Sequence, residues 1–299
     1  MTAVALPELD ARVRWSICVV DAGSGSGSGS DGSGSDGSGS DGSGSDGSGG
    51  VLAAHEPHVV CETASVGKVF LLIEVARRLE AGELDPGQRI QIPEEHRVAD
   101  SGLLYRMRDQ RVTVEDAALL VGAVSDNLAT NALLWLCGLD TVRAVAPSLG
   151  FTDTSLHDFI RNERTPDLPW TPSYGTGAEL AELMRRLGSG DIVSPAVSAR
   201  VLDWLAADVD TSMVADALLL DPLAHVDDEY QGMILRHKTG STSFARIDIG
   251  HLSGPAATVA YAVAANWKDA ADDLRAPVLA AMHAIGEQLR AHVTGIPAS

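Results

Sequence analysis

The chain has 299 residues, of which 45% are apolar, 21% charged and 4% aromatic, and its formal net charge is −19. This composition is typical of a globular protein with a sizeable core and excludes a disordered or fibrous chain. The excess of acidic residues repels phosphate backbones and anionic lipid surfaces. We therefore expect neither a nucleic-acid partner nor a membrane partner.

The sequence also indicates the compartment. No uninterrupted apolar run reaches the roughly 18 residues of a membrane-spanning helix, and the first twenty residues carry Glu8, Asp10, Arg12 and Arg14 where a signal peptide has its apolar core. The three cysteines are widely spaced and form no CxxC pair, so buried free thiols in a reducing compartment are predicted. We expect a cytoplasmic monomer that needs no metal and no organic cofactor.

A low-complexity tract interrupts the first predicted hairpin. Residues 12–20 alternate as a strand with Val13, Trp15, Ile17 and Val19 on one face, and 51–54 begins a returning strand. Residues 23–50 between them are only Gly, Ser and Asp, so we expect a disordered, flexible insertion at the hairpin tip, with weak cation binding as the alternative. Lengthening a turn to about thirty residues costs roughly 2 kcal/mol, so the hairpin should survive it.

The remaining chain predicts two kinds of structure in turn. Apolar spacing indicates helices over 65–81, 114–123, 128–137, 140–149, 178–187, 195–207 and 275–292, and strands over 232–238, 245–252 and 258–266. This order predicts an α/β plus all-α fold, in which a five-stranded antiparallel sheet flanked by helices carries an inserted helical domain. We expect residues 12–63 and 208–299 to form the sheet domain and 64–207 the helical one.

Two short motifs carry chemistry near helix starts. Ser65 and Lys68 are one helical turn apart, so the hydroxyl and the amine share one face. A lysine in a dry pocket loses its proton easily enough to act as the base for the serine. Ser125-Asp126-Asn127 falls between two predicted helices and can present a hydroxyl and a carboxamide to the same cavity.

A third motif, Lys238-Thr239-Gly240, is predicted to end a strand. It offers an ammonium and a hydroxyl for a substrate carboxylate, and a glycine that lets substrate backbone approach closely. Lysine is scarce, with only Lys68, Lys238 and Lys268 beside 19 arginines. Two of the three lysines thus lie in the motifs, and an amine that must release its proton cannot be replaced by arginine.

Together the three motifs resemble those of the class A serine β-lactamases. The resemblance extends to Asp100-Ser-Gly-Leu-Leu, to Val112-Thr-Val-Glu-Asp-Ala-Ala-Leu-Leu, to the residues after Ser125, and to Arg246-Ile-Asp-Ile-Gly-His-Leu, and it covers most of residues 12–290 outside the tract.

The resemblance implies a role for each site residue. Ser65 is the acylated nucleophile, Lys68 relays its proton, and Ser125 passes a proton to the leaving nitrogen. Asn127 holds the substrate amide, while Lys238 and Thr239 bind the substrate carboxylate. Arg246 assists them, or else is a surface ion pair. The oxyanion hole combines the Ser65 N–H with that of Ser241 or Thr242.

The Ω loop departs from the family pattern. The family reads Arg-Trp-Glu-Pro-Glu-Leu-Asn, in which the first glutamate activates the water that frees the acyl-enzyme. This chain reads Asn-Glu-Arg-Thr-Pro-Asp-Leu-Pro from Asn162. Aligning Arg164, Pro166 and Leu168 removes that glutamate and puts Pro169 in place of the asparagine. Acylation should persist and release should suffer, unless Glu163 or Asp167 substitutes.

The predicted function is a class A-like serine hydrolase that opens β-lactam amides through an acyl-serine, with impaired deacylation. The alternatives are a D-alanyl peptidase or small-ester hydrolase of the same superfamily, and a β-lactam-binding module without turnover. Elsewhere, we read the acids Asp208 and Asp210 and those at 227–229 as solvated loop residues, Trp135 and Trp204 as core, and the histidines at 55 and 58 as loop residues without a third metal ligand.

Overall fold

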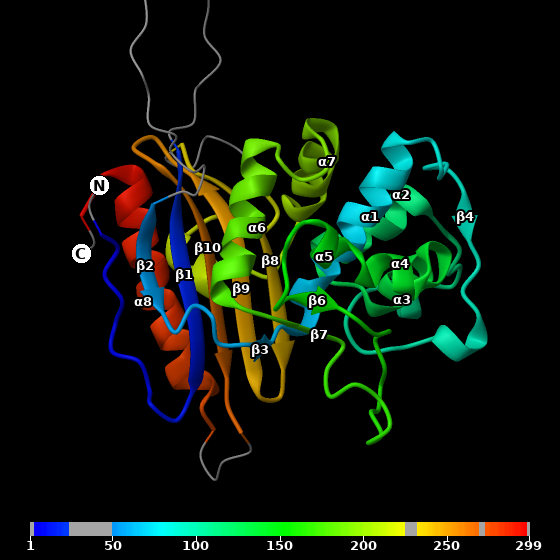
Figure 1. The fold of residues 1–299 in the computed structure, drawn as a ribbon, viewed down its shortest axis with the longest axis horizontal. Helices are drawn as coiled ribbons and strands as arrows, with labels where there is room; N and C mark the ends of the chain where they lie inside the picture. The colour runs from blue at the N-terminus through cyan, green and yellow to red at the C-terminus, as the bar shows by residue number, and fades with distance from the viewer. Residues whose placement is uncertain (1–2, 24–49, 225–231, 269–272, 298–299) are drawn as a thin grey trace, which may run out of the picture.

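The computed structural model describes residues 3–23, 50–224, 232–268 and 273–297. A five-stranded antiparallel sheet in the order β2-β1-β10-β9-β8 is its central layer, as the sequence predicted. The strands are β1 (Arg14–Gly23), β2 (Val51–His55), β8 (Ile234–Thr242), β9 (Ala245–Ser253) and β10 (Thr258–Asn266). Figure 1 shows a block of helices beside the β8 end of this sheet.

The predicted hairpin is confirmed. In the β1–β2 pair Cys18 lies opposite Ala54, and the Asp21 N–H donates to the Gly50 carbonyl at 2.9 Å. On its other side β1 pairs with β10, where Ile17 lies opposite Val263. Residues 24–49 of the tract lie outside the described residues.

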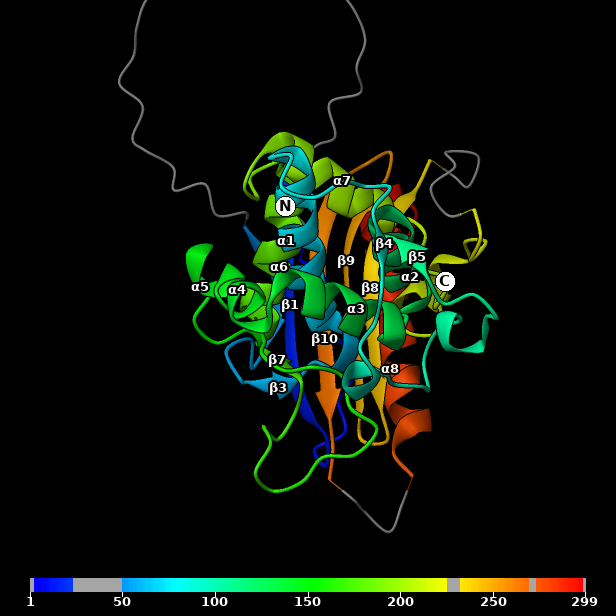
Figure 2. The same ribbon diagram turned by 90° about the vertical axis from the view of Figure 1, so that its right-hand side faces the viewer.

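The sheet is buried on both faces. The predicted apolar face of β1, including Trp15, Ile17 and Val19, packs with α8 (Arg275–Thr294) in one core. The opposite face packs with α6 (Gly177–Ser189) in a second core that continues into the helical block. Figures 1 and 2 show α6 and α8 on opposite sides of the sheet. Helix α6 therefore packs on the sheet, although its sequence lies within the segment 64–207.

Most of residues 64–207 form the helical block. Its helices are α1 (Lys68–Glu80), α2 (Val114–Val124), α3 (Asn127–Cys137), α4 (Leu139–Arg143), α5 (Val145–Ser148) and α7 (Pro195–Leu205). Small sheets tie its loops together, with strands β3 (Cys61–Glu62), β4 (Arg89–Ile90), β5 (Val112–Thr113), β6 (Ser155–Leu156) and β7 (Ser173–Gly175). Short 3-10 turns complete it: η1 (Ala64–Gly67), η2 (Glu94–His96), η3 (Leu104–Arg106) and, beyond the block, η4 (Val214–Leu218).

Several local predictions differ from the structure. The predicted helix 65–81 begins as the 3-10 turn η1, and the predicted helix 140–149 is divided into α4 and α5. Strand β8 runs on to Thr242, so the Lys238 motif lies inside the strand instead of ending it. Trp204 is buried as predicted, but Trp135 is 46% exposed because it lies on the outer face of α3.

Other side-chain predictions divide in the same way. The three cysteines are buried free thiols, and burial raises the pKa of each to about 11. Asp208 is buried, not solvated. The acids at 227–229 lie outside the described residues. Within the described ranges, the structure has no cluster of metal-ligating side chains and no helix long and apolar enough to cross a bilayer.

Candidate active site

A cavity of about 520 Å³ lies between the outer strand of the sheet, β8, and the helical block. Residues of all three motifs line it, although up to 176 positions separate them in the sequence: Ser65, Ser125, Asn127, Thr239, Gly240 and Ser241. The motifs therefore form one site.

The turn that carries Ser65 is tightly held. Ser65 lies in η1, between β3 and α1, and is partly exposed to the cavity. The residue before it, Ala64, has φ +47°, a left-handed conformation that an alanine rarely adopts. The Ser173 hydroxyl donates to the Ala64 carbonyl, and the Thr63 N–H donates to the Ser173 carbonyl at 3.2 Å. These contacts from β7 hold the conformation that presents Ser65.

Gly240 lets β8 lie directly against this turn. A Cβ at position 240 would lie 2.6 Å from the Thr63 carbonyl oxygen and 3.0 Å from the Ser65 nitrogen. The glycine thus accommodates the protein's own backbone, whereas the sequence suggested that it made room for substrate backbone. Any larger residue must displace the serine turn.

Lys68 connects the first motif to the second. Its side chain is fully buried at the start of α1, and Nζ donates to the Ser125 carbonyl at 2.7 Å, the Ser125 hydroxyl at 3.1 Å and Asn127 Oδ1 at 2.7 Å. Burial, and next the positive charge of Lys238, hold the pKa of the Lys68 amine well below its ordinary value. A lysine in this environment can serve as a proton acceptor.

Local capping produces the gap that presents Ser125. Ser125 ends α2 with φ +54°, and Asp126 begins α3 by accepting from the Ala129 N–H at 2.9 Å. The other Asp126 oxygen accepts from the N–H groups of Leu103 and Leu104, each at 2.7 Å. Asp126 is buried and structural: it fixes the two helix ends and the loop that forms the opposite wall of the cavity.

Lys238 lies behind the cavity wall instead of lining it. Its Nζ is buried, 3.2 Å from Asp208 Oδ2, which also accepts from the Thr239 N–H at 3.2 Å. The position of Asp208 in a loop predicted a solvated acid, so its place in the site was not foreseen. The signal that could have found it is the lysine itself, since a buried ammonium requires a carboxylate partner.

The free edge of β8 faces this cavity. The Thr239 N–H and carbonyl both bond to side chains outside the sheet ladder, the first to Asp208 and the second to Lys238. Backbone groups two residues apart in a strand point to the same side. The Ser241 N–H is therefore directed to the free edge, and the Thr242 N–H toward β9.

Arg246 lies on β9, the strand after the Lys238 motif, as expected, but its side chain bonds to neighbouring carbonyls. Its guanidinium donates to the carbonyls of Thr242 at 2.6 Å and Ala245 at 2.7 Å, and it lies over the Trp267 ring. It is not among the residues that line the cavity. These contacts fasten the β8–β9 hairpin.

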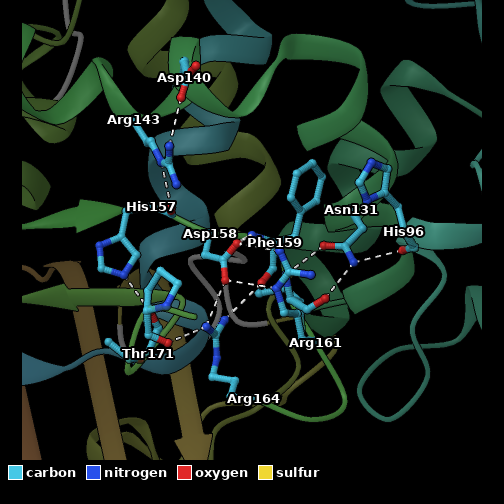
Figure 3. A network of polar contacts seen from close by, with 12 residues as sticks. His96, Asn131, Asp140, Arg143, His157, Asp158, Phe159, Arg161, Arg164 and Thr171 are labelled. Atoms are coloured by element: carbon cyan, nitrogen blue, oxygen red, sulfur yellow. Dashed lines mark hydrogen bonds and ion pairs between the residues drawn. The ribbon is translucent and has the colours of Figure 1, made fainter. Parts of the chain in front are cut away.

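Residues 158–172, here called the Ω segment, fold around a buried carboxylate. Asp158 accepts from Arg164 at 2.9 Å and from Arg161 at 3.0 Å, and Arg164 also donates to the Pro169 carbonyl at 2.8 Å (Figure 3). Asn131 joins α3 to the segment by donating to the Ile160 carbonyl at 2.8 Å.

The two acids expected to support deacylation lie away from the cavity. Glu163 and Asp167 are exposed, and neither is among the lining residues. The Ω segment instead contributes Arg161, Asn162 and Arg164 to the wall. Four other carboxylates, none of them predicted to belong to the site, line the cavity: Glu62, Asp100, Asp208 and Asp210.

Comparisons with known proteins identify the family and the fold. Residues 45–293 match the model of the Beta-lactamase enzyme family. A solved β-lactamase from Sphaerobacter thermophilus is 25% identical, with a TM-score of 0.75 over 95% of this chain and 93% of that one. A β-lactamase from Xanthomonas campestris, 22% identical over 94% and 92%, has a TM-score of 0.71.

A protein described as PBP-A shares the fold at 18% identity and a TM-score of 0.70, over 94% of this chain and 90% of that one. A variant of PBP-A is described as an acyl-enzyme complex with penicillin G; it is 18% identical over 94% and 90% of the chains, with a TM-score of 0.69. Several ancestral class A β-lactamases share the fold as well. By the family match over most of its length, the chain belongs to the β-lactamase enzyme family and is a β-lactamase-like serine hydrolase.

Proposed function

We propose that the protein opens the amide bond of β-lactams by acylation of Ser65. The observation that carries this proposal is the buried Lys68 amine, bonded to Ser125 and Asn127 one turn from a cavity-lining serine. The low pKa of Lys68 makes a neutral amine available as the base.

Acylation begins when the Ser65 oxygen attacks the lactam carbonyl and its proton passes to Lys68. The N–H groups of Ser65 and Ser241 stabilise the oxyanion, because both are presented at the junction of the serine turn and the free edge of β8. Ser125, bonded to Lys68, returns the proton to the departing nitrogen. The lactam C–N bond breaks and an ester on Ser65 remains.

The substrate is held by its carboxylate and its side-chain amide. The carboxylate binds beside Thr239 at the free edge of β8, where the Thr239 hydroxyl exchanges Asp210 for the substrate, and the buried Lys238 lies behind this edge in its ion pair with Asp208. Asn127 is placed to bond the side-chain amide, since its Oδ1 is fixed by Lys68. Arg246 takes no part in this proposal.

The fate of the acyl-enzyme separates the proposal from its alternatives. Glu163 and Asp167 lie outside the cavity, which favours slow release. A PBP-A variant described as an acyl-enzyme with penicillin G shares the fold. We include a long-lived acyl-enzyme as the second candidate function. The monomeric state and the cytoplasmic location stay predictions from the sequence.

Pre-steady-state kinetics with a chromogenic cephalosporin, combined with intact mass, tests the proposal. We expect a burst of one equivalent and a covalent adduct that Ser65→Ala abolishes. Steady turnover after the burst identifies a β-lactamase, and a burst alone identifies the trap. Silence toward the cephalosporin with turnover of small esters identifies an esterase. An adduct that survives Ser65→Ala contradicts the assignment of the nucleophile.

A further inference from the structure

A carboxylate close to the nucleophile has no part in the mechanism so far. Glu62 lies in β3, three residues before Ser65, and both side chains line the same cavity. Three residues of chain span at most about 10 Å between Cα atoms. The two side chains are therefore anchored close together on the wall of one cavity.

The orientation of Glu62 follows from the strand that carries it. Side chains alternate along a strand, and the two neighbours of Glu62 are both buried: Cys61 packs in the core and Thr63 donates to the Ser173 hydroxyl at 2.9 Å. Glu62 points the other way, toward the cavity and the Ω segment. There it is near Thr171 and Arg164.

The backbone of Glu62 is fixed from two sides. It pairs with Tyr174 in β7. In addition, the Glu62 N–H donates to Asn266 Oδ1 at 2.7 Å, and the Glu62 carbonyl accepts from Asn266 Nδ2 at 3.1 Å. The Asn266 side chain thus clamps one residue, 204 positions away, onto the end of β10. A rigidly held backbone of this kind is what a general base requires.

The other cavity carboxylates are engaged or lie on other walls. Asp208 is bound to Lys238 and to the Thr239 N–H. Asp210 accepts from the Ser212 hydroxyl at 2.6 Å. Asp100 is exposed beside Ser101, on the wall formed by the helical block. Of the four, Glu62 alone shares the chain segment of the nucleophile and faces the Ω segment.

The electrostatic setting of Glu62 suits a proton acceptor. Burial raises the pKa of its carboxyl, while the Thr171 hydroxyl and the Arg164 guanidinium offset part of this rise. By contrast, hydrogen bonds from Ser212 and Thr239 outweigh burial and hold the pKa of Asp210 below its ordinary value. A base works best when its pKa approaches the working pH.

We propose that Glu62 is the catalytic base of deacylation, which accepts a proton from the water that cleaves the Ser65 ester. This inference rests on the proposed acylation of Ser65. The water oxygen bonds to the ester carbonyl carbon as one water proton moves to the Glu62 carboxylate. The bond from that carbon to the Ser65 oxygen then breaks, and the proton passes from Glu62 to the serine oxygen. The products are free serine and a carboxylic acid, and Glu62 is ionised again.

The decisive comparison is Glu62→Gln against the native protein, with the acyl-enzyme followed by intact mass after a pulse of cephalosporin. Glutamine keeps the size and polarity of the side chain but cannot accept a proton. We expect acylation to change little and release to slow by on the order of 10²–10³-fold. In the native protein the release rate should rise as the pH passes through the raised pKa of Glu62, because the ionised carboxylate is the active form. This rising limb of the pH profile should be absent in Glu62→Gln.

Two further variants distinguish a catalytic role of Glu62 from a purely structural one. Glu163→Gln makes the same chemical change at an exposed site outside the cavity, and it should release the acyl group at the native rate. Asn266→Ala loosens the clamp without touching the carboxylate, and it should slow release by about tenfold while its pH limb remains.

The outcomes separate the two proposals. If no adduct forms in the native protein, the proposed acylation fails and the role of Glu62 fails with it. If the adduct forms and Glu62→Gln releases it at the native rate, only the role of Glu62 is overturned. The same holds if the native protein keeps its adduct as long as Glu62→Gln does, or if the pH limb survives the substitution.

Discussion

The two walls of the cavity differ in how their polar groups are used. On the acylation wall, Lys68, Ser125 and Asn127 are joined by hydrogen bonds of 2.7–3.1 Å around a buried amine. On the Ω wall, the hydrogen bonds of Asp158 and Arg164 hold the segment to itself, and its remaining acids face solvent. The polar groups of the first wall surround a buried amine, whereas those of the second stabilise the fold of the Ω segment.

Under the two proposals made above, the two halves of the hydrolytic cycle depend on different elements of the fold. Formation of the acyl-enzyme needs a serine, a base and an oxyanion hole, and all of these lie on η1, α1, the α2–α3 junction and β8. Release needs only one more base near the ester. A chain can therefore keep the first set while the second is moved to another element, here β3.

The largest effect is expected at Lys68. Replacing it with alanine removes the base, so the acylation rate should fall by on the order of 10²–10⁴-fold. In the native protein the same rate should rise with pH through the lowered pKa of Lys68 and level off above it, because the neutral amine is the active form. Stopped-flow kinetics measures both. Native acylation rates in Lys68→Ala would show that another group takes the proton.

The second largest effect on the acylation rate is expected at Gly240. In Gly240→Ala the new Cβ meets the Thr63 carbonyl oxygen at 2.6 Å, so the serine turn must move. A displacement of about 1 Å at a reacting group can cost about 10²-fold in rate. Gly87→Ala is the control, since its Cβ meets only the Asp85 carboxylate oxygen at 3.5 Å. Equal acylation rates in the two variants would contradict the close approach of β8.

On the Ω wall, stability should change more than acylation. Asp158→Ala leaves two arginines without their shared carboxylate, and we expect a loss of about 2–3 kcal/mol in unfolding free energy, measured by denaturant titration. Asp140→Ala removes an exposed acid bound to Arg143 (Figure 3) and should leave the midpoint unchanged. A large loss of acylation in Asp158→Ala would mean that the two walls are coupled.

The pH dependence of that stabilisation has a definite sign. Burial raises the pKa of Asp158, but the hydrogen bonds from Arg161 and Arg164 outweigh it and lower the pKa. The contribution to stability is therefore present above about pH 4, the ordinary value for aspartate, and is lost as the pH falls through the lowered pKa. Asp158→Ala should flatten this acid limb.

The smallest effect is expected from the exposed acids of the Ω segment. Glu163→Gln combined with Asp167→Asn should alter acylation and release by less than about twofold, because surface changes away from a site act weakly. The same burst assay measures both rates. A marked loss of release would mean that the segment closes onto the substrate and brings one of these carboxylates to the ester.

Patterns of local origin were predicted well. The period-two alternation of β1 and the helical turn between Ser65 and Lys68 depend on neighbours in the sequence, and the structure confirms the first directly. Residues of all three motifs also line one cavity, while the roles given to them stay predictions.

What the sequence could not supply depends on distant partners. Asp208 is buried beside its ion-pair partner Lys238, and the backbone of Glu62 is fixed by Asn266 and β7. Arg246 shows the converse: its motif position suggested substrate, but nearby carbonyls hold its guanidinium. Burial and charge pairing of this kind follow from the assembled fold and not from local spacing.

The pairing of β1 with β10 has a consequence for biosynthesis. Ile17 and Val263 are neighbours in the sheet, so β1, which can pair early with β2, finds its second partner β10 only after nearly the whole chain has left the ribosome. Contacts of such long sequence separation form slowly. A nascent chain that stalls before position 258 lacks β10, so it cannot complete the sheet, and it lacks Asn266, which holds the backbone of Glu62. We expect such a chain to be inert toward acylating reagents. Reactivity toward such a reagent is thus a direct readout of completed folding.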